Sequence, residues 1–152
     1  MPLLPFSSKY TNIDWCVFSG VQPNTSSLLE PSVIQGGLCT GIQKLVQRWL
    51  IRLMTIKGSM PFAQERGCGF ISEISKVQTE SAVRIAYLFA QMEIEPQLLA
   101  EETEDMPDDE RFLSSELLGV SRLRGACSLS VKLTSRAGES REVLLPIYET
   151  GR

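Results

Sequence analysis

The clearest pattern of apolar positions lies between residues 38 and 54 and follows the repeat of an α-helix. Apolar side chains recur there every three or four residues, which places them on one face of a helix. Gly58 follows soon after the pattern stops, where a helix terminator is expected. The sequence therefore predicts a helix that packs on the core through Leu38, Ile42, Leu45, Val46, Trp49, Leu50, Leu53 and Met54.

The opposite face of this helix is polar and largely basic, and consists of Gln43, Lys44, Gln47, Arg48 and Arg52. A face of this kind usually lies in water. An acidic partner is the alternative, but solvation alone explains the pattern.

A second helix is predicted to begin at Thr79, a residue type that caps helix N-termini, with Glu80 in the first turn. Pro96 is expected to end or kink it. Its apolar positions cover more than one stripe, which predicts burial on two sides, between core layers or under a partner. These positions are Val83, Ile85, Ala86, Leu88, Phe89 and Met92.

The last third of the chain changes to the two-residue repeat of strands. Cys127, Leu129, Val131 and Leu133 alternate with polar residues, and after Ala137-Gly138-Glu139 the alternation resumes at Val143, Leu145 and Ile147. This pattern predicts an antiparallel hairpin. A further strand is expected within residues 117–124. The predicted fold is α+β, with two principal helices packed on a small antiparallel sheet that ends in a C-terminal hairpin.

Residues 1–32 contain four prolines and many Ser, Thr and Asn residues, and they follow neither a helical nor a strand repeat. They are interpreted as an extended N-terminal arm. Large apolar side chains are spaced through it, so we expect it to lie across its own domain or a neighbour. Residues 33–152 are expected to form a single domain, because 152 residues suit one hydrophobic core.

Composition narrows the class of protein. Apolar residues make up 43% of the chain and charged residues 22%, as in ordinary globular proteins. No apolar run approaches the roughly 18 residues that span a bilayer, and no basic region precedes the apolar N-terminus. We expect synthesis in the cytoplasm, without a secretion signal or membrane contact.

The residue types of common active sites are scarce. The chain has no histidine, which excludes Ser-His and Cys-His nucleophiles, and Cys16, Cys39, Cys68 and Cys127 form no Cys-x-x-Cys pair. Free, mostly buried thiols are the simpler interpretation. No catalytic residue, cofactor or metal site is therefore predicted.

Negative charge is concentrated in one segment. Seven of the eighteen acids lie between Glu101 and Glu110, and the rest of the chain has eleven acids against fifteen bases. Those bases are dispersed and not interleaved with aromatic residues, so nucleic acid is not an expected partner. The acidic run itself is interpreted as a solvated loop.

The segment Thr55 to Phe70 reads TIKGSMPFAQERGCGF and combines turn residues with apolar anchors. Glycine and proline let a short segment hold one shape without regular secondary structure. We predict an ordered loop that packs on the first helix through Phe62 and Phe70. A simple helix stop followed by a turn is the alternative.

This segment resembles the central motif of the small baseplate wedge proteins of contractile-tailed phages. These are the sheath initiators, sometimes labelled lysozymes, with relatives in type VI secretion and other contractile injection systems. The matching motif loop consists of Lys57, Gly58, Ser59, Pro61, Phe62, Glu65, Gly67, Gly69 and Phe70. Met60 replaces an arginine of the family pattern, and residues 63–66 depart from its Pro-Glu-Phe step at two positions.

The resemblance also implies a Glu-Pro-Arg triplet that contacts neighbouring wedge proteins. Glu95-Pro96-Gln97 keeps the Glu-Pro step but lacks the arginine, whereas Glu110-Arg111 keeps an acid and the arginine but lacks the proline. We favour Glu110 and Arg111, because the planar fork of arginine binds carboxylates or carbonyls in a bidentate way. An ordinary helix end and an exposed salt bridge are the alternative for both.

The family likeness implies a structural protein of the virion, in the tail baseplate. Its implied partners are baseplate wedge proteins and the contractile sheath protein, with tail tube or hub proteins as further candidates. The strands from Cys127 to Ile147 would present an edge to the sheath. The alternatives are a peptidoglycan-degrading, lysozyme-like enzyme and a free-standing adaptor. Glu65 and Glu73 are the nearest carboxylates for hydrolysis, but no spacing selects an acid pair.

Overall fold

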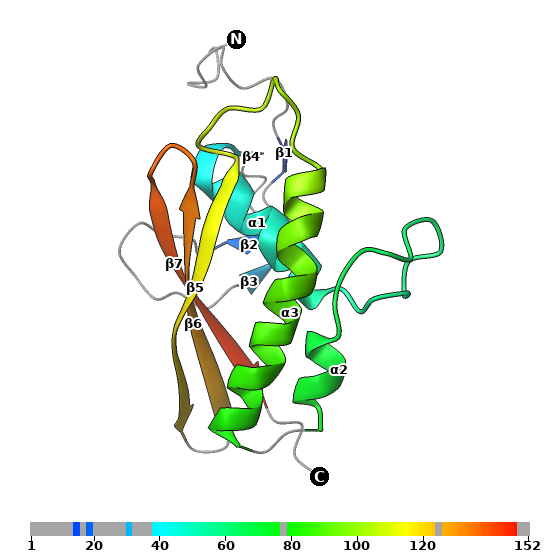
Figure 1. The fold of residues 1–152 in the computed structure, drawn as a ribbon. Coiled ribbons are helices and arrows are strands. Elements are labelled where there is room, and N and C mark those ends of the chain that lie inside the picture. The colour runs from blue at the N-terminus through cyan, green and yellow to red at the C-terminus, as the bar shows by residue number, and fades with distance from the viewer. Residues whose placement is uncertain are drawn as a thin grey trace.

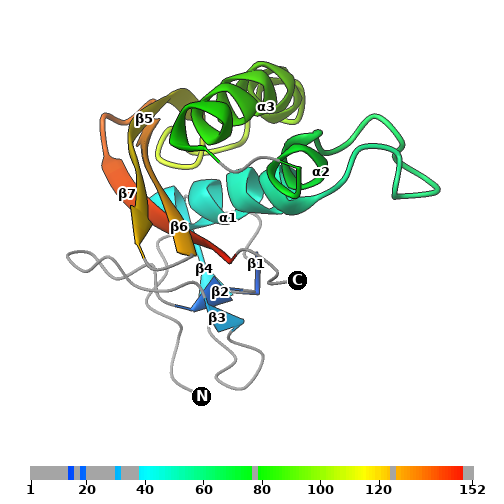
Figure 2. The same ribbon diagram turned by 90° about the horizontal axis from the view of Figure 1, so that it is seen from below.

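The chain has an α+β fold in a computed structural model that describes residues 14–15, 18–19, 30–31, 38–76, 79–123 and 126–148. Within these residues it forms three helices and a three-stranded antiparallel sheet (Figure 1). Helices α1 and α3 lie on one face of this sheet, and α2 packs against them on the side away from it (Figure 2). The predicted fold class is confirmed.

Helix α1 extends over Gly41–Met54 and provides much of the core. Leu45, Val46, Trp49 and Leu53 are completely buried, as their spacing predicts. The helix begins three residues later than expected, because Leu38–Cys39 (β4) pairs with Asp14–Trp15 (β1). A second short pair joins Phe18–Ser19 (β2) to Glu30–Pro31 (β3). The rest of the predicted arm lies outside the described residues.

Helix α3 extends over Glu80–Ala100. Its predicted N-cap is present, since the Thr79 side chain accepts a hydrogen bond from the Ala82 N–H at 3.2 Å. The sequence predicts that Pro96 ends or kinks the helix, and the first of these alternatives is wrong, because the helix continues to Ala100. Proline removes only one main-chain donor, and the buried Ile94 and Leu98 on either side of it hold the last turns on the core.

Within the part of the chain that the structure describes, one side of α3 is buried. The core side carries Val83, Tyr87, Ala90, Ile94 and Leu98. The second apolar stripe that the sequence predicts is exposed, so burial between two core layers is wrong. Its exposed members are Ile85, Leu88, Phe89, Met92 and Leu99.

Helix α2, Phe70–Ile74, has no counterpart among the predicted elements. It directly follows the motif segment and brings Phe70 into the core. The Phe70 ring meets Tyr87 of α3 edge-on, with centroids 6.3 Å apart, and Trp49 of α1 lies 6.4 Å from the same tyrosine. These aromatic contacts join the three helices.

The sheet has the order β5-β6-β7, with strands Phe112–Leu123, Ala126–Ser135 and Ser140–Tyr148. The C-terminal hairpin is confirmed, and Gly138 adopts the positive φ of 84° that its turn requires. Strand β5 begins five residues before the predicted strand. Two bulges, at Leu113 and Leu118, interrupt its alternation.

Candidate functional site

The motif segment forms a loop whose two ends are joined by main-chain hydrogen bonds. The Cys68 N–H donates to the Thr55 carbonyl at 3.0 Å, and the Lys57 N–H donates to the Cys68 carbonyl at 3.2 Å. We call Thr55, Lys57, Gly67 and Cys68 the loop root, and residues 59–66 the loop tip. The tip projects from the body of the molecule (Figure 1).

Gly67 is the position in the loop root where only glycine fits. Its φ is +90°, and a Cβ there would collide with the carbonyl of Thr55. The Gln97 amide of α3 holds the same residue: its Oε1 accepts from the Gly67 N–H at 3.0 Å, and its Nε2 donates to the Gly67 carbonyl at 2.8 Å. Gln97 thus fixes the loop root on α3 by two hydrogen bonds.

Cys68 and Phe70 anchor the end of the loop in the core, where both are buried. The Cys68 thiol lies 3.5 Å from the Leu53 carbonyl and 3.8 Å from the Arg52 carbonyl, at the C-terminal end of α1. Burial raises the pKa of this thiol. Cys68 is therefore a structural residue rather than an activated nucleophile.

The loop tip is exposed, and the expectation that Phe62 packs on the first helix is wrong. Phe62 is 102% exposed and Met60 is 43% exposed. Three hydrogen bonds nevertheless define the path of the main chain: Gly58 N–H to Gln64 O at 3.1 Å, Ala63 N–H to Met60 O at 3.2 Å and Arg66 N–H to Ala63 O at 3.1 Å. The tip thus presents apolar side chains on an internally bonded turn.

The remaining motif residues lie on the surface of the loop or at its end. Lys57 donates to the Glu93 carboxylate of α3 at 2.9 Å, and this bond raises the lysine pKa. Ser59, Pro61 and Glu65 are exposed, and Gly69 precedes α2 with an ordinary negative φ.

The two candidate triplets lie in different parts of the structure and make different contacts. Glu95 and Gln97 both bond within the chain: Glu95 accepts from Ser115 Oγ and from Gln91 Nε2, both at 2.9 Å, while Gln97 holds Gly67. Pro96 is exposed. Gln97 thus makes a two-bond contact to a peptide group of its own chain.

Glu110 is buried rather than exposed. It forms an ion pair with Lys44 of α1 at 3.3 Å and accepts from the Gly41 N–H at 3.2 Å. The same segment receives Arg48, whose guanidinium donates to the Glu110 carbonyl at 3.1 Å. Arg111 donates to the carbonyls of Thr103 and Glu104, both at 2.8 Å. These contacts fold residues 101–111 onto the start of α1.

The predictions of a solvated basic face on α1 and a solvated acidic loop are therefore each wrong in part, since Glu104, Asp105 and Asp108 remain exposed. Lys44, Gln47 and Arg52 are buried, as are Asp109 and Glu110. The acidic segment covers the basic face from within the same chain, and each neutralises the other's charge.

A cluster of arginines surrounds Glu101 at the end of α3. Arg48 and Arg66 approach its carboxylate at 3.8 Å and 3.5 Å, and Arg52 forms a closer ion pair with it. Burial, and then the charges of the other two arginines, lower the pKa of Arg52 to about 10. Sequence analysis missed Glu101, although the i, i+4 spacing of Arg48 and Arg52 signals a shared anionic partner.

Strand β6 has no free edge, because it pairs with β5 on one side and β7 on the other. Its residues Cys127, Leu129, Val131 and Leu133 are buried against the helices. Of the two strands predicted between Cys127 and Ile147, β6 therefore offers no edge to another protein, and only β7 could. The edges belong to β5 and β7.

Part of the β5 edge is occupied by the chain itself. The Phe112 N–H donates to the Glu102 carboxylate at 2.6 Å, and the Ser115 carbonyl accepts from Gln91 Nε2 at 3.0 Å. Glu102 and Gln91 thus take up two main-chain groups that another strand would need.

Strand β7 pairs only with β6 within the described residues. The Ser135 N–H bonds to the Glu139 carbonyl, so by antiparallel alternation the main-chain groups of Ser140, Glu142 and Leu144 point away from β6. Pro146 lies in the same outward set and has no N–H to offer. Val143 and Leu145 are buried on the core face, and the side chain of Ile147 lies outside the described residues.

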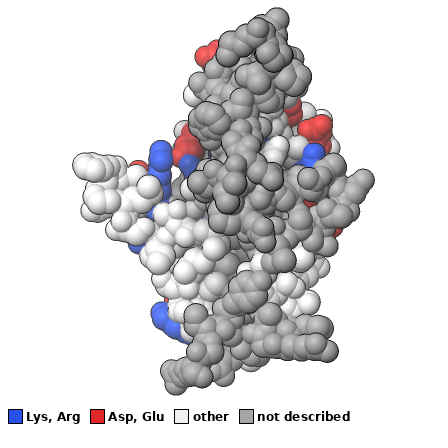
Figure 3. Space-filling view, turned by 180° about the vertical axis from the view of Figure 1, so that it is seen from behind, with Lys and Arg blue, Asp and Glu red and all other residues white. Residues whose placement is uncertain are grey.

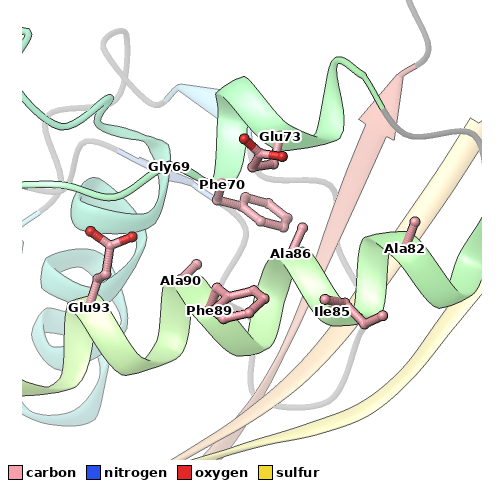
Figure 4. A pocket seen from close by; sticks show the side chains of 9 residues that line it. All are labelled: Gly69, Phe70, Glu73, Ala82, Ile85, Ala86, Phe89, Ala90 and Glu93. Atoms are coloured by element: carbon pink, nitrogen blue, oxygen red, sulfur yellow. The ribbon is translucent and has the colours of Figure 1, made fainter.

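An open pocket of about 510 Å³ lies between α2 and α3. Figure 4 shows Phe70 and Glu73 on one wall and the side chains of α3 on the other. Its two carboxylates are paired with lysines: Glu73 with Lys76 at 3.3 Å and Glu93 with Lys57 at 2.9 Å.

Charged groups are scattered over the reverse face of the molecule (Figure 3), where the described Lys and Arg side chains form no continuous stripe. No group of three or more His, Cys, Asp or Glu residues suited to a metal ion occurs within the described ranges. None of the helices described has the length and apolarity needed to cross a membrane.

Comparisons of the chain with protein-family models, curated proteins and solved structures found no match in any of the three searches. The likeness to baseplate wedge proteins therefore rests on the motif residues of this chain.

Proposed function

We propose that the chain is a structural component of a contractile tail baseplate, where it joins wedge proteins and templates the first ring of the contractile sheath. The proposal rests chiefly on the motif order in Thr55–Phe70. That order has a physical basis in this fold, because Gly67, Cys68 and Phe70 fix the loop root, while Pro61 and Phe62 are presented to solvent. A segment with a fixed root and an apolar tip suits an assembly contact.

The sheet supports the sheath-templating part of the proposal. A strand added at β7 would find the outward main-chain groups of Glu142 and Leu144. Pro146 would limit the ladder at one end, which helps to set its register. The wedge contacts would use the loop tip, with Arg111 and Glu95-Pro96-Gln97 of α3 as further candidates.

A lysozyme-like activity is less well supported. Glu65 is exposed at the loop tip, and the carboxylates of the α2–α3 pocket are held by lysines. A glycosidase acid instead needs an apolar environment that keeps it protonated. An adaptor outside a virion would give no account of the motif.

A proline substitution on β7 tests the proposal in particles assembled with the mutated chain. Leu144→Pro removes an outward N–H while sparing the bonds to β6. We expect particles with a complete baseplate and tube but no sheath, seen by electron microscopy. Leu144→Ala is the matched control, because it changes the side chain but keeps the N–H, and it should assemble sheath.

Normal sheath on Leu144→Pro particles would refute templating through β7. A thermal melt of the purified variant must show a folded protein, since a proline that unfolds the chain would also abolish assembly. If the chain is absent from the junction of sheath and baseplate in images of wild-type particles, the whole proposal is wrong.

A further inference from the structure

The outer face of α3 is an apolar stripe directly opposite the core-facing side of the helix. Phe89 and Met92 are its most exposed members, at 63% and 72%. Ile85, Leu88 and Leu99 are also about half exposed. Leaving large apolar side chains in water costs free energy relative to burying them. A stripe of this kind marks a binding surface.

The spacing of the stripe indicates what it binds. Ile85, Leu88 and Met92 follow the three-and-four spacing of a heptad seam, and Leu99 lies one heptad beyond Met92, with Glu95 at the seam position between them. This is the pattern by which one helix packs along another. An extended strand would instead present contacts at every second residue. From residue 85 to residue 99 the stripe is about 21 Å long at 1.5 Å per residue, which suits a helix of about four turns.

An open groove of about 510 Å³ lies beside the stripe and shares Ile85 and Phe89 with it. Ala82, Ala86 and Ala90 lie one turn apart on α3, and their side chains point towards α2 (Figure 4). Ala86 and Ala90 are already buried within this chain, so of the three alanines only Ala82 stays partly accessible in the groove. Phe89 and Phe70 add apolar walls to the pocket between the helices.

The charges around this surface are mainly acidic once ion pairs are taken into account. Lys57 and Lys76 are used by Glu93 and Glu73. Just beyond α3, Glu101 and Glu102 are paired with arginines. The other charged side chains of α3 are Glu80, Arg84 and Glu95, two acids against one base, and the acids Glu104 and Asp105 follow its C-terminal end. The C-terminal end of a helix adds partial negative charge.

We propose that the outer face of α3, with the α2–α3 groove, binds an amphipathic helix of another protein whose apolar stripe is flanked by lysine or arginine. A second copy of this chain fits less well, because a symmetric contact through α3 would bring two acidic borders together. This surface is separate from the β7 edge and from the loop tip, so it does not depend on the proposed function.

The test uses the full chain and two labelled helical peptides of about four turns. Both have leucine at the a and d positions, and lysine in one or glutamate in the other at the flanking positions. Fluorescence anisotropy at fixed salt measures their affinities. We expect the lysine peptide to bind at least about tenfold more tightly, a difference of about 1.4 kcal/mol.

Met92→Ser should weaken binding of the lysine peptide by about tenfold, as for a central apolar contact. Met54→Ser is the matched control, since Met54 is 50% exposed at the end of α1, outside this surface, and it should leave affinity unchanged. Both positions are exposed, so both variants should keep the wild-type melting temperature.

The proposal is wrong if neither peptide binds, if the two bind equally well, or if Met92→Ser and Met54→Ser have the same affinity. Sedimentation of the wild-type chain is the remaining check. A dimer that Met92→Ser dissociates would show that a second copy occupies the surface, and this result would also overturn the proposal.

Discussion

The root and the tip of the Thr55–Phe70 loop have similar sequence character but opposite surroundings. Both contain glycine or proline next to an apolar residue. At the root, Gly67 and Cys68 are buried and bonded to α3 and α1, whereas Phe62 at the tip is fully exposed. The difference shows that a motif can combine positions that determine the fold with positions that are free to contact a partner.

The largest expected effect is at the root. Gly67→Ala places a Cβ against the Thr55 carbonyl at a positive φ. The left-handed conformation costs roughly 1 to 2 kcal/mol and each displaced hydrogen bond about 1 kcal/mol, so we expect a loss of about 3 kcal/mol in the free energy of unfolding. Urea unfolding measures it. A loss below about 1 kcal/mol would show that the root can rearrange.

Gln97→Ala should have the next largest effect. It leaves the buried N–H and C=O of Gly67 without their partner, and an unpaired buried polar group costs about 1 to 3 kcal/mol. We expect a loss near 2 kcal/mol. Gln97→Glu keeps an acceptor for the N–H but no donor for the carbonyl, and should lie between the wild type and Gln97→Ala. Hydrogen exchange at the Gly67 amide is a direct second readout.

Gly58→Ala tests the boundary between root and tip. Gly58 has a φ of +82°, but no atom lies within 4 Å of the position a Cβ would take. Only the conformational penalty remains, and we expect a loss of about 1 kcal/mol. Gly58→Asn should lose less, because asparagine tolerates left-handed φ better. If Gly58→Ala lowered the free energy of unfolding as much as Gly67→Ala, the collision of the added Cβ with Thr55 would not be what makes Gly67 the more sensitive position.

Phe62→Ser should have the smallest effect on stability. The side chain is fully exposed, and substitutions at such positions usually change stability by less than about 0.5 kcal/mol. Thermal unfolding of the variant and of the wild type provides the test. A clear destabilisation would mean that the ring packs on the protein in solution, and the loop tip would then resemble the root.

The repeats of apolar residues predicted the main helices and the hairpin because each of these elements buries one regular face. The start of β5 escaped detection for the opposite reason. At the bulges, Leu113 and Leu118, an extra residue shifts the alternation of buried and exposed positions. The second bulge appears in the sequence as two consecutive leucines, Leu117 and Leu118. A pattern search with a strict period of two fails at such positions.

The polar contacts of the candidate site were less predictable. Lys44 and Glu110 are 66 residues apart, and neither one's sequence neighbours indicate that the two meet in a buried pair. Gln97 likewise reaches Gly67 only because the end of α3 passes the loop root. Such contacts depend on the tertiary arrangement of the helices, which local periodicity does not specify.

Pro146 has a further consequence for the protein before it meets any partner. An open strand edge can pair with the same edge of another molecule and so start aggregates. On β7 the proline removes one outward donor, and Glu142 places a charge two residues before the start of the Leu144–Leu145 pair. Pro146 and Glu142 together leave only a short run of outward main-chain N–H and C=O groups on β7. A run this short disfavours edge-to-edge aggregation of free chains.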